Sequence, residues 1–264
     1  MVTDALGVGV IGGAGWLGSA IIGSLLKASI FQPSQICVSY RRSKPALLEG
    51  VYLTQDNRDL LARSDVVILS VRPHDWRDLD LDCDGKLVIS VMAGVSIEQL
   101  TSRHNTKRVV RCLPNAAVEV GHSYTPWISV PDLSADDRSL CRMIFSAFGA
   151  QDEFQTEQDI DYLGVLTGTG PAFPALLASA MMKDAIARGM SAAIARKAIN
   201  SVFVGAGRLL EKHDQCPLET VDAFHRYRGL TSAAMTAMET SGFYDCVSNG
   251  LAAGLKRSED ISHS

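Results

Sequence analysis

The stretch IGGAGWLGSAII, residues 11–22, is the strongest indication of the fold of this 264-residue chain. It packs four glycines into its first eight residues and then continues as an apolar helical pattern. Gly13, Gly15 and Gly18 form GxGxxG between a predicted strand and a predicted helix, where unpaired backbone amides receive a pyrophosphate. The sequence therefore predicts a dinucleotide-binding turn made by Gly13, Ala14, Gly15, Trp16, Leu17 and Gly18.

Short runs rich in Val and Ile recur through the first half of the chain. They lie at residues 7–12, 35–40, 66–71, 86–92 and 107–113. Their nearly continuous apolar character is typical of parallel strands that helices cover on both faces. Residues 123–130 are a further candidate strand, and Ser134 is expected to cap the helix that follows. We predict an α/β fold with a Rossmann-like, doubly wound parallel sheet that binds NAD(P) at residues 1–158.

A different pattern begins at about Asp159, where the Val/Ile runs give way to helical periodicity rich in Ala, Leu, Met and Gly. Residues 159–264 are predicted to form an all-α dimerisation domain. Helices are expected from Gly170–Pro171 to about Gly189, and near residues 192–213, 217–224, 232–240 and 245–256, before a frayed tail. Because these helices are apolar on several faces, we expect a homodimer or higher homo-oligomer through the C-terminal helices.

The composition excludes several classes of protein. The hydrophobic fraction of 47% and charged fraction of 20% are typical of a soluble globular chain, and a net charge of −4 argues against a nucleic-acid partner. The longest apolar runs fall short of the roughly 20 residues that cross a bilayer, so no membrane association is expected. No export signal is evident, and the six cysteines form no CxxC pair. We therefore expect a cytoplasmic protein without a metal site.

The residues after the second predicted strand indicate which dinucleotide is bound. An NAD site usually has an acid there to bind the ribose hydroxyls, whereas this chain reads SYRRSK at residues 39–44. Ser39, Arg41, Arg42 and Ser43 offer donors and positive charge to a 2′-phosphate. This pattern favours NADPH over NADH. The alternative interpretation is a solvated basic loop.

Two more segments follow predicted strands and should reach the same edge of the sheet. Val71, Arg72 and Pro73 follow the third strand, and Ala93 and Gly94 follow the fourth. We expect their backbone to pass near the nicotinamide ribose. The adjacent His74 is a candidate general acid, although a single loop histidine more often has no catalytic role.

Several motifs occur in one characteristic order: SVRP (70–73), RCLPN (111–115), GTGPA (168–172) and LTSAAMTAMETSGF (230–243). With them the chain resembles the pyrroline-5-carboxylate reductases over nearly its whole length. The resemblance implies hydride transfer from NAD(P)H to the C=N carbon of 1-pyrroline-5-carboxylate, giving L-proline without a metal. It also implies that Asn115 binds the cofactor, and that each substrate pocket joins one chain's nucleotide domain to its partner's interleaved helices.

The substrate loop departs from that family. RYRGLT, residues 226–231, stands where the family has Ser-Pro-Gly-Gly-(Thr or Ala)-Thr. The resemblance implies that Thr231 is catalytic, through a hydrogen bond or proton to the imine nitrogen. The substrate is expected to contact Arg228, Gly229, Leu230 and Thr231. Either Arg226 or Arg228 pairs with the carboxylate of a different cyclic imine acid, or the loop has drifted in a proline-forming enzyme. Thr231 is alternatively a helix N-cap.

Two functions outside this reaction stay open. A β-hydroxyacid dehydrogenase uses a lysine on the long interdomain helix, where this chain has Lys183; that family's asparagine four residues later is replaced here by Ala187. A non-catalytic nucleotide-binding relative would keep the glycine loop alone. The retained Asn115, Thr231 and GTGPA turn argue against it.

Overall fold

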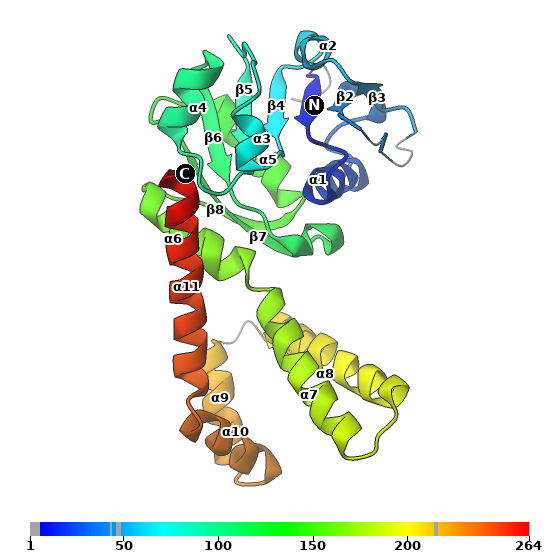
Figure 1. Cartoon of the computed structure of the whole chain (residues 1–264), viewed down its shortest axis with the longest axis vertical. Helices are drawn as coiled ribbons and strands as arrows, with labels where there is room; N and C mark the ends of the chain where they lie inside the picture. Colours follow the sequence, from blue (N-terminus) through cyan, green and yellow to red (C-terminus); the bar gives the residue numbers. More distant parts are fainter. Residues whose placement is uncertain (1–5, 43, 46–48, 214–215, 264) are drawn as a thin grey trace. The chain divides into compact units, whose positions relative to one another are not determined.

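A computed structural model describes residues 6–42, 44–45, 49–213 and 216–263 (Figure 1). The chain divides into two compact units. Unit 1 comprises Met1–Thr169 together with Gly254–Ser264, and unit 2 comprises Gly170–Ala253.

Unit 1 is built on an eight-stranded sheet with the order β3-β2-β1-β4-β5-β6-β7-β8. All neighbouring strands are parallel except β6 and β7. Ile11, Ser39, Leu69 and Ser90 lie in one row of the register, so the carboxyl ends of the first strands meet at one edge. The strands are β1 (Val8–Ile11), β2 (Ile36–Ser39), β3 (Tyr52–Thr54), β4 (Val66–Leu69), β5 (Leu87–Ser90), β6 (Arg108–Cys112), β7 (Ser123–Ser129) and β8 (Gly149–Glu153).

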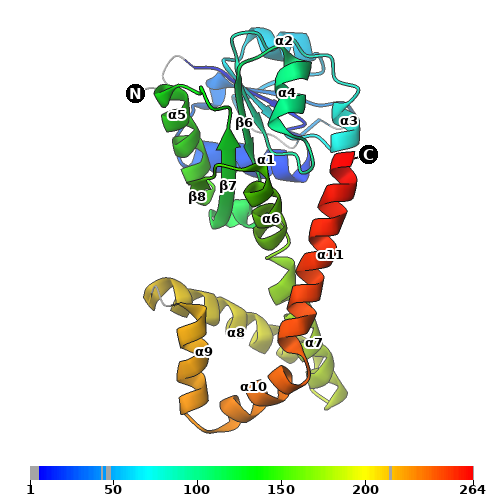
Figure 2. The ribbon, with the colours of Figure 1, turned by 90° about the vertical axis from the view of Figure 1, so that its left-hand side faces the viewer.

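Helices cover both faces of this sheet (Figures 1 and 2). Alternate strand residues such as Val8 and Val10 pack in one core cluster with α1 (Trp16–Lys27) and α5 (Ala135–Ser146). The residues between them face a second cluster. There α2 (Asn57–Ala62), α3 (Pro73–Trp76) and α4 (Ile97–His104) pack against residues such as Ile11 and Val67. The predicted doubly wound, Rossmann-like fold is confirmed.

The sequence located six of the eight strands, because their buried residues make continuous apolar runs. The candidate strand at residues 123–130 is β7, and Ser134 caps α5 by accepting a hydrogen bond from the Asp137 amide at 3.1 Å. Strands β3 and β8 were missed because β3 is only three residues long and β8 is the polar segment GAQDE. Short 3-10 helices η1 (Pro33–Gln35) and η2 (Ala116–Val120) complete the connections.

The sequence also missed α6 (Glu157–Gly168), which packs on β7 within unit 1. Ile160 of this helix is buried with Leu113 and Ile128. Unit 1 therefore extends to Thr169, beyond the domain boundary predicted after residue 158. It also includes the end of α11, from Gly254 onward.

Unit 2 is helical and contains α7 (Ala172–Ala187), α8 (Ala192–His213), α9 (Pro217–Arg226), α10 (Leu230–Thr240) and the first part of α11 (Phe243–His263). The predicted bounds of α8 agree with the structure. The expectation of a frayed tail after residue 256 is wrong, because α11 continues to His263.

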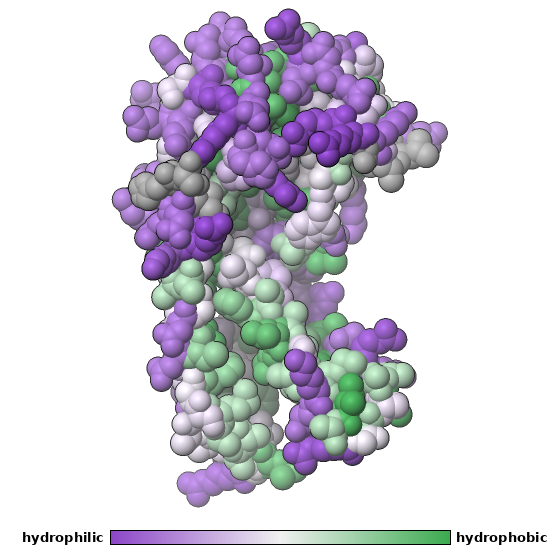
Figure 3. Space-filling model, viewed as in Figure 1, coloured by the Kyte–Doolittle hydropathy of each residue, from purple (hydrophilic) through white to green (hydrophobic). Residues whose placement is uncertain are grey.

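The helices of unit 2 expose most of their apolar side chains. Among the described residues of this unit, the buried hydrophobic ones are Ala195 and Ile199, while Leu176, Leu218 and Val204 are more than half exposed. Figure 3 shows this contrast, with hydrophobic residues at the surface of the helical unit and mainly hydrophilic ones at the surface of unit 1. Such a surface needs a covering partner.

The segment Glu157–Ala187 is long and apolar enough to cross a membrane by length and composition alone. The chain breaks this segment into two helices, α6 and α7, around Thr169. One such segment is weak evidence for a membrane span, because an apolar helix that packs in a soluble assembly passes the same test.

Candidate cofactor and substrate sites

The glycine-rich turn between β1 and α1 uses one more glycine than the predicted motif. Gly12 has a φ of +82°, and a Cβ on it would lie 2.4 Å from the Ser70 carbonyl oxygen. Gly13 instead faces the side chains of Val38, Ile22 and Val10. A Cβ on Gly18 would lie 2.7 Å from the Gly12 oxygen, so this residue lets α1 start against the turn. Gly15 is the N-cap of α1, whose first amides point out of the helix end.

A pocket of about 430 Å³ lies at the carboxyl edge of the sheet and joins this turn to the ends of β2 and β4. Of the predicted cofactor residues it brings together Ala14, Gly15, Ser39, Arg41, Arg42, Val71 and Arg72. Residues that the sequence did not single out also line it: Tyr40, Gln55, Asn57, Ser70, Asp75, Asp78 and Leu79. Gln55 donates from Nε2 to the Arg41 carbonyl oxygen at 3.1 Å, which fixes the backbone after β2.

The far end of this pocket is basic. Arg41, Arg42, Arg72 and His74 line an adjoining cavity of about 440 Å³ around one carboxylate, Asp75. Arg41 Nη2 lies 2.7 Å from Asp75 Oδ1, and this guanidinium lowers the pKa of the Asp75 carboxyl. Ser43, also predicted to bind the cofactor, lies outside the described residues.

The other predicted cofactor residues lie near that edge without lining the 430 Å³ pocket. The Trp16 ring is mostly exposed, and its indole N–H donates to Glu119 of η2, while Leu17 packs against the core. Pro73 is the first residue of α3, and Ala93 and Gly94 form the turn after β5. These turns follow neighbouring parallel strands, as predicted.

Asn115 has a structural role as the N-cap of η2. Its Oδ1 accepts from the Ala117 amide at 2.8 Å, and its Nδ2 donates to the Thr167 carbonyl oxygen at 3.0 Å. The Asn115 amide donates to Ser123 Oγ at 3.0 Å. These bonds tie the loop after β6 to α6, and they hold Asn115 in a single position.

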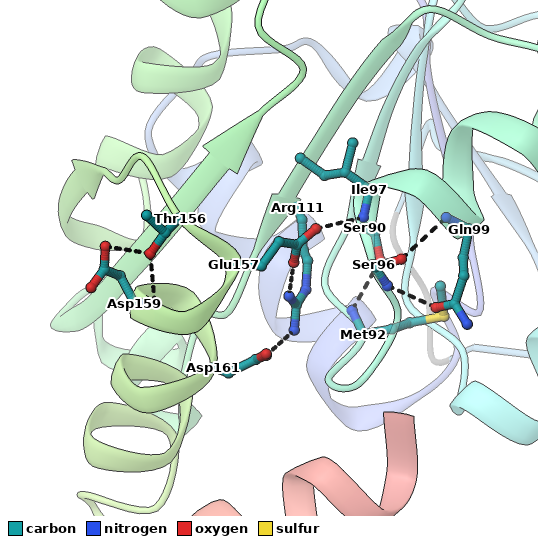
Figure 4. A network of polar contacts seen from close by, with 10 residues as sticks. All are labelled: Ser90, Met92, Ser96, Ile97, Gln99, Arg111, Thr156, Glu157, Asp159 and Asp161. Carbon is teal, nitrogen blue, oxygen red and sulfur yellow. Dashed lines mark hydrogen bonds and ion pairs between the residues drawn. The ribbon is translucent and has the colours of Figure 1, made fainter. Parts of the chain in front are cut away.

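Arg111 of the same RCLPN motif lies in a network that the sequence did not reveal (Figure 4). Its side chain is only 2% exposed and pairs with Glu157 and, at 2.5 Å, with Asp161, both on α6. Glu157 also accepts a hydrogen bond from the Ile97 amide at 2.8 Å. Arg111 therefore fastens α6 and α4 to the sheet. Spacing alone gives no signal for these partners, because they lie far along the chain.

The loop between α9 and α10 holds the predicted substrate residues of unit 2. Arg228 has a φ of +40°, and Gly229 is the N-cap of α10. Thr231 lies in the first turn of α10, so the alternative role of Thr231 as an N-cap is wrong. Tyr227 and Leu230 are 82% and 94% exposed. The loop is presented on the surface of the unit.

A histidine fastens this loop. His225, at the end of α9, contacts Glu239 Oε1 of α10 through Nε2 at 3.2 Å and Ser232 Oγ through Nδ1 at 3.5 Å. Sequence spacing does not reveal this residue, because its contacts form only where the turn folds α10 back onto α9. The contacts hold the two helix ends on either side of Arg228 and Gly229.

The remaining candidates are exposed. His74 is close to Asp75 but otherwise faces solvent, and Lys183 is an exposed residue of α7. Within the part of the chain that the structure describes, no group of three or more His, Cys, Asp or Glu residues is arranged to hold a metal ion.

Two family models match the chain: "NADP oxidoreductase coenzyme F420-dependent" at residues 7–94 and "Pyrroline-5-carboxylate reductase dimerisation" at residues 157–261. The pyrroline-5-carboxylate reductase of Synechocystis sp. is 27% identical, across 96% of this chain and 97% of its own length. That of Glycine max is 25% identical, across 95% and 94%. The chain belongs to the pyrroline-5-carboxylate reductase family. The reductase of Coxiella burnetii has a solved structure that matches with a TM-score of 0.85 and 25% identity, across 98% of this chain and 99% of its own.

The fold is also that of the Plasmodium falciparum pyrroline carboxylate reductase, whose structure was solved with NADP bound; the TM-score is 0.86 at 22% identity, across 98% and 99% of the two chains. The family model for the dimerisation domain matches this chain from the first residue of α6 onward and covers all of unit 2. The exposed apolar helices are therefore a homo-oligomerisation surface. Arg228, Gly229, Leu230 and Thr231 all lie within that model.

Proposed function

We propose that this chain is an NADPH-dependent reductase that converts 1-pyrroline-5-carboxylate, or a close cyclic imine acid, to the saturated amino acid. One observation supports this most directly. In a chain of this family, the glycine turn and the basic residues after β2 and β4 line a single pocket. The relatives named as pyrroline-5-carboxylate reductases match over nearly the whole chain.

The residues present fit a phosphorylated dinucleotide. Side chains at Gly12 and Gly18 would fill the turn, whereas the bare backbone leaves room for a pyrophosphate at the start of α1. Arg41, Arg42 and Arg72 would bind the 2′-phosphate. When bound, NADPH supplies the hydride that reduces the C=N carbon.

The protein's own contribution is to bind, orient and exclude water. The turns at Val71–Pro73 and Ala93–Gly94, with the fixed loop at Asn115, would support the nicotinamide half of the cofactor. The Thr231 hydroxyl would donate to the imine nitrogen, and the amides of Gly229 and Leu230 would bind the substrate carboxylate.

The conformation of Arg228 is the observation that favours a second candidate substrate. It takes a left-handed conformation at a position where the family has glycine, and a guanidinium there would pair with a carboxylate. A cyclic imine acid larger than 1-pyrroline-5-carboxylate is the substrate class that this residue favours. Both candidates use the same cofactor site.

We also propose that the homo-oligomer is at least a dimer through the C-terminal helices, and that the enzyme works in the cytoplasm without nucleic-acid or membrane partners. The family's dimerisation model supports the dimer. The exposed Cys216 and Cys246 are free thiols, which suits a reducing compartment.

The activity is tested by following NADPH absorbance with 1-pyrroline-5-carboxylate and with 1-piperideine-2-carboxylate. Turnover of either is expected, and the ratio of their kcat/KM values identifies the preferred ring. Reduction of NADP⁺ by a 3-hydroxy acid would instead support the hydroxyacid dehydrogenase alternative. Tight NADPH binding without any turnover would support the non-catalytic one.

The cofactor assignment has its own test. Replacing Arg41 and Arg42 with Ala should raise KM for NADPH by at least tenfold more than KM for NADH, since each charge-assisted contact contributes roughly 1.5–3 kcal/mol. Arg58→Ala is the matched control, because Arg58 is exposed on the neighbouring α2 and does not line the pocket. Equal effects of the double variant on both cofactors would contradict the assignment.

A further inference from the structure

One acidic residue lies inside the basic end of the cofactor pocket. The chain has no acid directly after β2, yet α3 brings Asp75 to the same place. Asp75 is the one carboxylate among the described residues that line the 440 Å³ cavity, and the others are Arg41, Arg42, Arg72 and His74. The carboxylate therefore occupies a position in which these cations would bind an external anion.

The ion pair has one fixed partner and one exposed partner. Asp75 is 21% exposed, and the adjacent Trp76 is buried with its indole N–H donating to His104 Nε2 at 2.6 Å. This bond anchors α3 below Asp75. Arg41, by contrast, is 73% exposed and reaches Asp75 only through its guanidinium. Rearrangement on ligand binding should thus move the arginine more than the carboxylate.

Asp75 is ionised throughout the neutral range, because Arg41 chiefly, with His74 and Arg72, lowers the pKa of its carboxyl. The titratable groups that line the 440 Å³ cavity with it are Arg41, Arg42, Arg72 and His74, and the nearby acid Asp78 lines only the 430 Å³ pocket. A change of pH near neutrality will not remove the negative charge. Only substitution can test its effect.

We propose that Asp75 competes with the 2′-phosphate of NADPH for Arg41 and thereby narrows the preference of this enzyme for NADPH over NADH. The inference rests on the proposed cofactor. A 2′-phosphate must displace Asp75 from Arg41 and lie beside a like charge, which weakens binding. A cofactor without that phosphate meets no repulsion, and Asp75 can accept a hydrogen bond from its ribose hydroxyls.

The experiment compares binding of 2′,5′-ADP, NADPH and NADH to the full-length wild type and to Asp75→Asn by calorimetry. Asp75→Asn should bind 2′,5′-ADP and NADPH on the order of tenfold more tightly, while NADH binding stays the same or weakens severalfold. The gain should shrink at high salt. Asp78→Asn is the matched control, since Asp78 lines the same pocket without pairing with Arg41, and it should change the NADPH-to-NADH ratio less than twofold.

Weaker binding of 2′,5′-ADP to Asp75→Asn would mean that Asp75 orients Arg41 for the phosphate, and it would overturn the proposal. Unchanged binding of all three ligands would overturn it as well, and would leave the proposed function intact. A wild type that binds neither 2′,5′-ADP nor NADPH contradicts both. Asp75→Ala, checked for an unchanged thermal midpoint, separates loss of the charge from misfolding of α3.

Discussion

Unit 1 and unit 2 differ in how much of their apolar surface a single chain can bury. The sheet of unit 1 has two core clusters, and strand residues such as Val10 and Val67 have no exposed surface. The helices of unit 2 leave Leu176 and Val204 mostly exposed. One chain therefore fixes the proposed cofactor residues by itself, whereas the proposed substrate loop is carried by helices that need a second copy for their burial.

The largest expected effect comes from disrupting the association of the chain with its second copy. Leu176→Glu with Val204→Glu places charges on the exposed apolar surface of α7 and α8 and should yield monomers without imine-reductase activity. Binding of 2′,5′-ADP should stay within about threefold, because the pocket is lined by unit 1 alone. Sedimentation velocity and calorimetry measure the two properties.

Tyr52→Glu is the control, since Tyr52 is an exposed apolar residue on the edge strand β3 of unit 1 and should leave the assembly unchanged. If the double variant keeps the wild-type mass, the exposed face of α7 and α8 is not the interface. If it loses 2′,5′-ADP binding together with assembly, the pocket depends on the second copy and the contrast between the units is wrong.

The next effect is confined to the glycine turn of unit 1. Gly18→Ala places a Cβ 2.7 Å from the Gly12 oxygen, so the turn must shift. We expect cofactor binding to weaken by about 10- to 100-fold, equivalent to 1–3 kcal/mol of overpacking. Gly23→Ala lies on the same helix with open space around it and should be neutral or up to about 1 kcal/mol more stable. Equal binding by both variants would show that the turn tolerates a side chain.

The contrast between the units also explains what the sequence could predict. Three strands could be predicted because both of their faces are buried, which makes continuous apolar runs at residues 7–12, 35–40 and 66–71. The GxGxxG motif could be recognised because local backbone requirements determine it. Even there, the positive φ belongs to Gly12 rather than to Gly13. Local pattern identifies the turn, but packing decides which glycine makes it.

Long-range pairs could not be predicted. Asp75 follows β4 in the chain, and its position beside Arg41 arises only when β4 and β2 flank β1 in the sheet. The same holds for Arg111 with Asp161 and for His225 with Glu239. Helix α6 was missed because its apolar residues pack in more than one direction, against β7 and against the end of α11. They therefore do not form one regular apolar face in the sequence.

A smaller effect concerns the buried support of α3. Burial lowers the pKa of His104, so on acidification the unfolded chain binds a proton near pH 6.5 that the folded chain binds only at lower pH. The free energy of unfolding should therefore fall as pH decreases below about 6.5, by at most about 1.4 kcal/mol per pH unit. Urea unfolding followed by tryptophan fluorescence reports on unit 1, which contains Trp16, Trp76 and Trp127.

His104→Gln keeps an acceptor for the Trp76 indole but does not titrate, so its stability should be flatter between pH 6.5 and 5 than that of the wild type. His122→Gln, at an exposed position of unit 1, should retain the wild-type slope. Identical slopes for all three proteins would show that His104 is not the source of the acid sensitivity.

The smallest effect lies in the substrate loop of unit 2, at Arg228. Its φ of +40° is unfavourable for a residue with a side chain, so Arg228→Gly should relieve strain of about 1 kcal/mol or more. The greater freedom of glycine in the unfolded chain offsets part of this gain, which leaves a net stabilisation below about 1 kcal/mol. Arg226→Gly is the matched control; because Arg226 ends α9 in helical conformation, this change should destabilise the protein by up to about 1 kcal/mol. Thermal midpoints at one fixed protein concentration compare the stabilities of the two variants with that of the wild type.

If Arg228 pairs with the substrate carboxylate, Arg228→Gly should also raise KM for the imine acid severalfold while the protein becomes more stable. A higher midpoint with an unchanged KM would instead assign the arginine a drifted position in a proline-forming loop, whose backbone amides bind the carboxylate alone.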